Sequence, residues 1–147
     1  MVYAAGAMKT ILRGPKLEGQ LTVDGAPWFS GRFNNLVINN TRIYGGEFDI
    51  TPVALTKDGR LDSVVFRSRR DYFYNFARAY WRLPAFLKPN RRTPGPNQSH
   101  YRQARSIVIK LTEPIPLQID GELFAPSDSF KIGIAPKAVT VRTPGTE

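Results

Sequence analysis

Residues 36–66 read LVINNTRIYGGEFDITPVALTKDGRLDSVVF, the most informative stretch of the chain. It begins with an apolar run at residues 36–38 and ends with another at residues 64–66. Between the two runs lie residues typical of turns: Asn39-Asn40, Gly45-Gly46, Pro52 and Asp58-Gly59. Apolar runs separated by this much turn chemistry predict two buried strands joined by a shaped, meandering connection.

Several short elements inside this stretch stand at spacings that occur together in one protein family. They are Asn40, Tyr44-Gly45-Gly46, Pro52 with Ala54, Asp58-Gly59 and Leu61-Asp62. The pattern resembles the C-terminal domain of lipid kinases of the diacylglycerol kinase and sphingosine kinase type. It departs from the family form at Glu47, where a third glycine is usual and would adopt positive φ angles freely. The resemblance implies a mainly β fold, an antiparallel β-sandwich with one or two helices and an NAD-kinase-like architecture.

The beginning of the chain is predicted to be helical. Apolar residues recur at helical spacing over residues 1–14, and Gly14-Pro15 ends the pattern. No capping residue precedes this helix, which favours a chain cut from a longer protein. In the resembled family such a helix links an N-terminal nucleotide-binding domain to the sandwich. We therefore expect residues 1–14 to be a linking helix and residues 15–147 to be the C-terminal β-sandwich domain.

Beyond the first helix, apolar and polar residues alternate as they do in half-exposed strands. We expect strands at residues 17–23, 28–38, 107–111, 115–119, 123–124, 130–134 and 139–141. The dipeptides Asp24-Gly25 and Asp120-Gly121 are predicted to form hairpin turns, because this pair suits the positive φ angles that such turns require.

The composition places the chain among cytoplasmic domains. Its 147 residues are enough for one domain with a real core. It has no cysteine, which excludes disulfides and thiolate metal sites. No apolar run approaches the ~20 residues of a membrane span, and the first residues do not read as a signal peptide.

The net charge of +9 is concentrated in one segment. Residues 67–105, which we call the basic arm, contain ten basic residues and one acid, and the rest of the chain carries no net charge. From Arg70 to about Leu87, apolar residues also follow a helical stripe: Phe73, Phe76, Ala77 and Tyr80. Basic heads beside aromatic bodies suit the interface of an anionic bilayer. We expect peripheral membrane association, with membrane or lipid contacts at Arg78, Trp81, Arg82, Phe86 and Lys88.

Two other functions are compatible with these features. Basic residues interleaved with aromatic ones are typical of single-strand nucleic-acid binders. The aromatic residues here follow a helical stripe instead of one face of a strand, which argues against nucleic acid as a partner. A non-catalytic, lipid-binding remnant of a kinase is the second alternative, and homodimerisation is left open.

The Asp58-Gly59 turn is a candidate metal site. In the resembled family the equivalent loop holds a structural Mg²⁺. The resemblance implies that the ligands here are the carboxylate of Asp58 and the main-chain carbonyls of Leu55 and Arg60. Mg²⁺ takes hard oxygen ligands and keeps several waters, so it needs few protein ligands.

The second candidate site is the tripeptide Asp120-Gly121-Glu122, embedded in PIPLQIDGEL. Taken alone, it reads as an ordinary hairpin turn. The resemblance implies that Glu122 is the base that takes a proton from a lipid hydroxyl, with Asp120 in a supporting role and the whole tripeptide bordering ATP. The sequence contains no P-loop and no glycine-rich GGDGT-like element. We therefore expect ATP to be held mainly by a separate nucleotide-binding domain, and the chain to be inactive as a kinase by itself.

Overall fold

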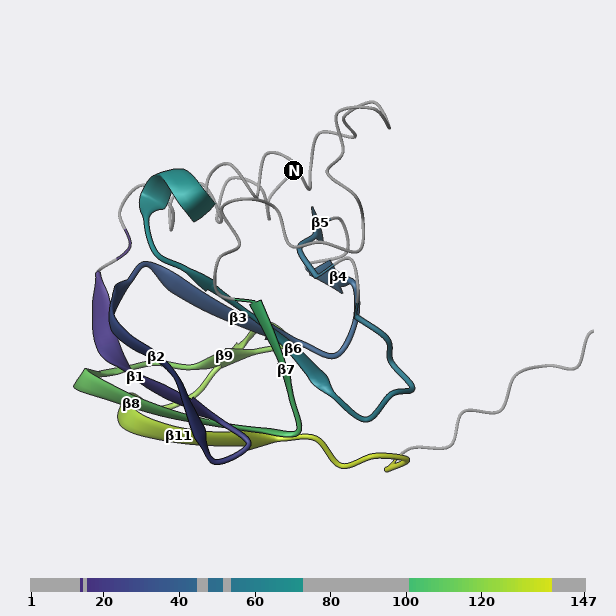
Figure 1. The fold of residues 1–147 in the computed structure, drawn as a ribbon. Helices are drawn as coiled ribbons and strands as arrows, with labels where there is room; N and C mark the ends of the chain where they lie inside the picture. The colour runs from purple at the N-terminus through teal and green to yellow at the C-terminus, as the bar shows by residue number, and fades with distance from the viewer. Residues whose placement is uncertain (1–13, 15, 45–47, 52–53, 73–100, 139–147) are drawn as a thin grey trace, which may run out of the picture.

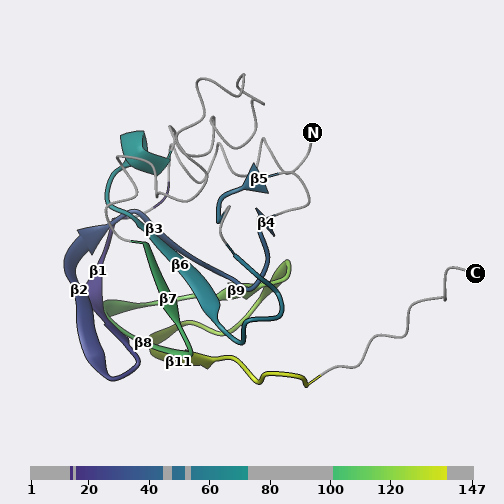
Figure 2. The same ribbon diagram turned by 45° about the vertical axis from the view of Figure 1, so that its right-hand side comes forward.

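The computed structural model describes residues 14, 16–44, 48–51, 54–72 and 101–138, and two antiparallel sheets dominate this part of the chain. The four-stranded sheet has the order β11-β8-β1-β2, formed by Ser127–Gly133, Ser106–Ile115, Leu17–Val23 and Ala26–Phe33. The three-stranded sheet has the order β3-β6-β7, formed by Asn35–Asn39, Leu61–Phe66 and Tyr101–Ala104. The two sheets lie as separate layers (Figures 1 and 2), which confirms the predicted mainly β sandwich.

Apolar side chains from both sheets fill the space between the layers. Leu21, Ile107 and Ile109 from the four-stranded sheet belong to the same buried cluster as Leu61 and Val65 from β6. Strand residues that alternate apolar and polar place every second side chain on this inner face. The alternation of apolar and polar residues along β8 and β11 therefore gives each strand one face toward the core, as the sequence predicts.

The two apolar runs at residues 36–38 and 64–66 form neighbouring antiparallel strands, with Val37 opposite Val64. All six residues of β6 are buried, so this strand is covered on both faces of its sheet. On the outer face, the ring of Phe66 packs on that of Tyr72, with ring centroids 4.8 Å apart. The connection between the runs carries a short pair, β4 (Ile43–Tyr44) and β5 (Phe48–Asp49). In both views this pair lies on the outer side of the three-stranded sheet (Figures 1 and 2).

The expected strand at residues 28–38 is wrong as a single element. The chain leaves the four-stranded sheet after Phe33 and enters the three-stranded sheet at Asn35. At the break, the buried Asn34 donates its backbone N–H to the carbonyl of Phe66, at 2.7 Å. The segment predicted as one strand therefore forms two strands in different sheets, β2 and β3, with no loop between them.

The hairpin between β1 and β2 turns at Asp24-Gly25, as predicted. Both residues have positive φ, 49° and 86°, which is the geometry of a type I′ turn. The carboxylate of Asp24 also accepts hydrogen bonds from the backbone N–H groups of Arg105 and Ser106, both at 2.9 Å. Asp24 thus joins its own turn to the beginning of β8.

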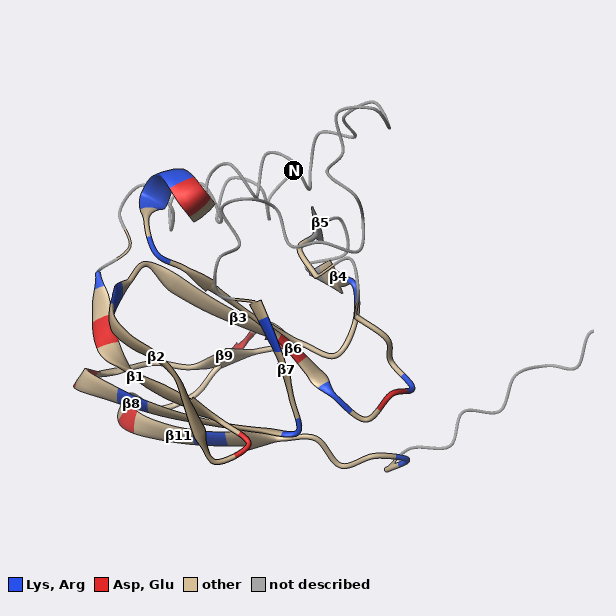
Figure 3. Cartoon of the chain, viewed as in Figure 1, with Lys and Arg blue, Asp and Glu red and all other residues tan. Residues whose placement is uncertain are grey.

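A helix begins at the end of the three-stranded sheet, within the predicted helical segment. Ser68 caps it by accepting the backbone N–H of Asp71 at 3.1 Å, and the carboxylate of Asp71 accepts the N–H of Arg67 at 3.2 Å. The Ser-x-x-acid spacing is a helix-start signal. The helix begins at Arg69, one residue before the predicted start at Arg70. Three exposed basic residues, Arg67, Arg69 and Arg70, surround this start (Figure 3).

Other predicted elements lie outside the described residues. These are the linking helix up to Arg13, the stripe of Phe73, Phe76, Ala77 and Tyr80, and the strand at 139–141. Within the part of the chain that the structure describes, no helix is long and apolar enough to cross a membrane.

Candidate functional site

The tripeptide Asp120-Gly121-Glu122 forms the turn of a separate two-stranded hairpin. Asp120 and Gly121 have φ angles of 49° and 97°, so the predicted turn is present. Strands β9 (Gln118–Ile119) and β10 (Glu122–Leu123) pair with each other and with neither main sheet. Asp120 and Glu122 are both exposed, so the structure brings the two predicted carboxylates together at one accessible turn.

The candidate base lies among exposed apolar side chains. Glu122 is the cross-strand partner of Ile119, and Phe124 donates its N–H to the carbonyl of Leu117 at 2.8 Å, which extends the same ladder. Since cross-strand partners share a face, Glu122 shares one with Leu117, Ile119 and Phe124. Ile119, Phe124 and, on the opposite face, Leu123 are 48, 49 and 74% exposed.

The predicted metal loop closes on itself through backbone hydrogen bonds. The N–H of Asp58 donates to the carbonyl of Leu55 at 3.4 Å, and the N–H of Arg60 donates to Oδ1 of Asp58 at 2.9 Å. Gly59 has a φ of 66°, which fits the predicted Asp-Gly turn. The loop thus keeps Leu55, Asp58 and Arg60 together.

Residues of this loop border a hollow of about 380 Å³, lined by Leu55, Thr56, Lys57 and Asp58. The second carboxylate oxygen of Asp58 accepts no hydrogen bond from the residues that the structure describes. A carboxylate oxygen and nearby main-chain carbonyls are hard donors that suit Mg²⁺. The described residues contain no group of three or more acidic, histidine or cysteine side chains that could hold a metal.

A buried polar cluster directly follows this loop, and it was not predicted from the sequence. Asp62 is fully buried on β6, and its Oδ1 accepts hydrogen bonds from the hydroxyl of Tyr101 and, at 3.2 Å, from the amide of Gln103. Its Oδ2 has no hydrogen-bond partner among the described residues. The signal in the sequence was an acid inside a strand, LDSVVF, that is apolar apart from Asp62 and Ser63, since acids are rarely buried without a partner.

Burial dominates the electrostatics of this cluster. Desolvation raises the pKa of Asp62, while the hydrogen bonds from Tyr101 and Gln103 lower it and the charge of Asp58 raises it further. Burial also raises the pKa of the Tyr101 hydroxyl, as do its hydrogen bond to Asp62 and the charges of Asp62 and Asp58. The charge of Asp58 thus acts in the same direction on the pKa values of both buried groups.

The β9–β10 hairpin and the Asp58 loop are two separate groups of predicted site residues. Among the described residues, no hydrogen bond or ion pair joins Asp120 or Glu122 to the loop that contains Asp58. The hollow beside Asp58 does not include Glu122. The predicted lipid contacts, Arg78, Trp81, Arg82, Phe86 and Lys88, lie outside the described residues.

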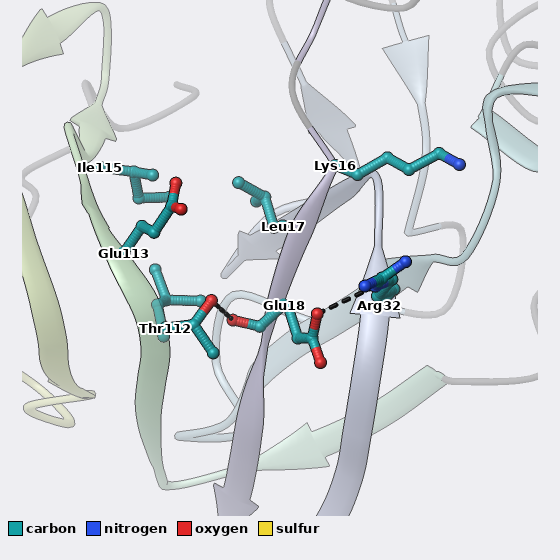
Figure 4. Close-up of a pocket in the computed structure, with 8 residues that line it drawn as sticks. Lys16, Leu17, Glu18, Arg32, Thr112, Glu113 and Ile115 are labelled. Atoms are coloured by element: carbon teal, nitrogen blue, oxygen red, sulfur yellow. Dashed lines mark hydrogen bonds and ion pairs between the residues drawn. The ribbon is translucent and has the colours of Figure 1, made fainter.

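A second hollow, of about 200 Å³, contains none of the predicted site residues (Figure 4). It lies at one end of the four-stranded sheet, beside an exposed ion pair in which Nε of Arg32 donates to Glu18 at 2.9 Å. The hydroxyl of Thr112 donates to the carbonyl of Glu18 at 3.3 Å and fastens β8 to β1 there. Lys16 and Glu113 also border this hollow, so both positive and negative side chains line it. This mixture does not indicate a particular class of ligand.

Comparison with known proteins agrees with this architecture. The family model described as the YegS C-terminal NAD kinase beta sandwich-like domain matches residues 1–143. The chain belongs to this family. The resemblance seen in the motifs is thereby confirmed, and the chain is related to the C-terminal domains of diacylglycerol kinase-like proteins. No curated protein resembles it in sequence at a significant level.

Two solved structures from Bacillus anthracis share its fold. One, a diacylglycerol kinase, is 18% identical with a TM-score of 0.65, and the match covers 94% of this chain and 47% of that one. The other carries the same kinase name provisionally; it is 19% identical with a TM-score of 0.63, over 88% of this chain and 40% of that one. This chain therefore spans less than half the length of either protein.

Proposed function

We propose that this chain is the C-terminal half of an ATP-dependent lipid kinase that phosphorylates the hydroxyl of diacylglycerol or a related lipid. Membership of the family supports this proposal, as does the size of the chain relative to the Bacillus anthracis proteins. The observation that carries it is the β9–β10 hairpin, which presents the carboxylate of Glu122 on an exposed turn surrounded by unpartnered apolar side chains.

In this proposal Glu122 is the general base. A lipid hydroxyl is not ionised at neutral pH, so a carboxylate within hydrogen-bond reach must accept its proton as phosphoryl transfer proceeds. Asp120 and Gly121 border the nucleotide. ATP itself is held mainly by a nucleotide-binding domain outside this chain. The exposed side chains of Ile119, Leu123 and Phe124 give that domain an apolar surface to cover.

Two further features support action on a membrane lipid. The loop with Asp58, Leu55 and Arg60 would hold Mg²⁺, which neutralises negative charge near the site. The basic arm would draw the enzyme to an anionic bilayer, since each basic residue near such a surface contributes about 1 kcal/mol. The protein would then act from the cytoplasm as a peripheral membrane enzyme.

Joining the chain to the nucleotide-binding half of a lipid kinase of the same family tests the proposal. The measurement is transfer of the labelled γ-phosphate of ATP to diacylglycerol in mixed micelles. We expect no transfer by the chain alone and transfer by the joined protein. Glu122→Gln should lower the rate by roughly 10²–10⁴-fold, whereas Asp128→Asn, an exposed acid on β11, should not.

Two results would contradict the proposal. Full activity of the Glu122→Gln protein would remove the assigned base. Phosphorylation of diacylglycerol by the chain alone would show that no second domain is needed.

A further inference from the structure

The β9–β10 hairpin has two different faces. Glu122 pairs with Ile119 across the hairpin. One step further from the turn, Phe124 donates its backbone N–H to the carbonyl of Leu117 at 2.8 Å. Cross-strand partners lie on the same face and successive residues on opposite faces, so these four side chains share one face and Leu123 lies on the other. The face that carries Glu122, which we call the Glu122 face, therefore combines one carboxylate with three apolar side chains.

Exposed apolar side chains are concentrated on this hairpin. Among the described residues, five large apolar side chains are exposed, and three of them lie between residues 119 and 124. Two of the three, Ile119 and Phe124, stand on the Glu122 face. Ligand sites are lined mainly by apolar groups, with a few polar groups that orient the ligand. The Glu122 face has this composition.

The geometry of phosphoryl transfer fixes the direction in which an acceptor extends from Glu122. The acceptor oxygen forms a bond to the γ-phosphorus of ATP while the bond to the ADP oxygen breaks, and the proton of the hydroxyl passes to the carboxylate. The attacking and leaving oxygens lie in line on either side of the phosphorus, so the rest of the acceptor lies on the side away from ATP. With ATP bordering the turn at Asp120 and Gly121, the acceptor extends along the hairpin toward Leu117 and Phe124.

We propose that the Glu122 face binds the beginning of the acyl chains of the acceptor, and that Ile119 and Phe124 make the kinase select acceptors with long apolar chains. This inference rests on the role of Glu122 as the base in the proposed function. The nucleotide-binding half then covers the hairpin with the acceptor lying between them on the Glu122 face. On the opposite face, Leu123 contacts that half directly.

The dimensions of diacylglycerol agree with this placement. Its two acyl esters stand on the glycerol carbons that do not bear the hydroxyl, so the chains begin a few bonds from the oxygen that donates to Glu122. The Cβ atoms of cross-strand partners such as Glu122 and Ile119 are about 5 Å apart. Residues two apart on one strand, such as Glu122 and Phe124, are separated by about 7 Å. Both apolar side chains therefore lie at the distances at which the acyl chains begin, whereas a charged phosphate gains nothing from contact with them.

The test compares two diacylglycerols that differ only in chain length, dioctanoylglycerol and diacetylglycerol, as acceptors for the chain joined to the nucleotide-binding half. The measurement is kcat/KM for phosphate transfer from ATP, with both acceptors in the same detergent micelles. Ile119→Thr and Phe124→Thr introduce a residue that suits strands and is less apolar. Each should lower kcat/KM for dioctanoylglycerol by about 10-fold and for diacetylglycerol by less than about 2-fold.

Leu123→Thr is the matched control, because it makes the same kind of change on the opposite face of the hairpin. It should change kcat/KM by the same factor for both acceptors and leave their ratio unaltered. Circular dichroism during heating compares the folding of the three variants with that of the unchanged protein.

A second measurement needs no substitution. A diacylglycerol that carries a diazirine near the beginning of one acyl chain inserts on illumination into the residues that it contacts in the joined protein. We expect mass spectrometry to find the label within residues 117–124, and excess dioctanoylglycerol to remove it. A label found only outside this segment would overturn the inference.

The outcomes separate this inference from the proposal on which it rests. Equal losses for the two acceptors in Ile119→Thr and Phe124→Thr, or no loss for either, would show that the acceptor does not lie on this face. In that case the inference fails, while loss of activity in Glu122→Gln still supports the base. If Glu122→Gln keeps full activity, or the joined protein transfers phosphate to neither acceptor, the proposed function fails and the inference fails with it.

Discussion

The hydroxyl of Tyr101 on β7 donates to the carboxylate of Asp62 on the neighbouring strand β6. The two residues are 39 positions apart in the sequence, and Gln103 donates to the same oxygen. This contact joins β6, the strand that follows the Asp58 loop, to β7 at the edge of the same sheet.

Tyr101→Phe should lower the free energy of unfolding by about 1–3 kcal/mol, because it removes a hydrogen bond from a buried carboxylate. Urea denaturation in the presence of a chelator measures the change without a contribution from bound cations. The effect of Tyr101→Phe should shrink in an Asp62→Asn background, by about 0.5 kcal/mol or more. Strictly additive effects would mean that the two side chains do not interact.

The two Asp-Gly hairpins should respond differently to the same substitution. Asp24 and Asp120 share a φ of 49°, but of these two side chains only Asp24 accepts hydrogen bonds from described backbone N–H groups, those of Arg105 and Ser106. Asp120→Ala should cost about 1 kcal/mol for placing alanine at positive φ. Asp24→Ala should cost about 2 kcal/mol more, since it also leaves two backbone donors unpaired. Thermal or urea unfolding of the two variants measures the difference, and equal costs would contradict it.

Gly19 is required by the close approach of β1 to β8. A Cβ atom at this position would lie 2.3 Å from the carbonyl oxygen of Lys110, a backbone atom that cannot move freely. We expect Gly19→Ala to destabilise the chain by about 2–3 kcal/mol or to prevent folding. The control is Gly133→Ala on β11, where the nearest atom would be 3.6 Å away. Circular dichroism followed during heating compares the two, and a stable Gly19→Ala protein would show that the strands can separate without cost.

Leu123 should matter to the joined kinase and not to the chain alone. Its side chain is 74% exposed, so Leu123→Gln should change the free energy of unfolding by less than about 0.5 kcal/mol. In the joined protein the same change should lower phosphoryl transfer, because it weakens the contact of the hairpin with the nucleotide-binding half. Ile43→Gln, at a 45% exposed position on β4, is the control. Normal transfer by the Leu123→Gln protein would mean that the hairpin is not covered by the second domain.

Much of the architecture was predictable because it depends on local preferences. The alternation along β8 and β11 identifies strands with one buried face, since successive side chains point to opposite sides. The turns at Asp24-Gly25 and Asp120-Gly121 follow from the ease with which these residues adopt positive φ. The sequence predicted buried strands at residues 36–38 and 64–66, and their pairing, with Val37 opposite Val64, comes from the structure.

The candidate site was predictable in part. Sequence motifs identified Asp58, Asp120 and Glu122, and the structure places Asp58 and Asp120 on turns and Glu122 at the first position of β10. The exposure of Ile119, Leu123 and Phe124 was missed, because apolar residues in a strand pattern read as core. Whether such a strand joins a sheet or projects as a separate hairpin depends on the strands available to pair with it.

The sequence by itself determined the alternating strands such as β1, β8 and β11 and the Asp-Gly turns, because side-chain alternation and φ preferences act over a few residues. Tertiary structure alone decided that the chain changes sheets at Asn34, that Asp24 binds residues 81 and 82 positions away, and that Asp62 is buried beside Tyr101. The physical reason is that these contacts join residues far apart in the sequence. A hydrogen bond between two strands, or the burial of a carboxylate between them, forms only when the strands pair.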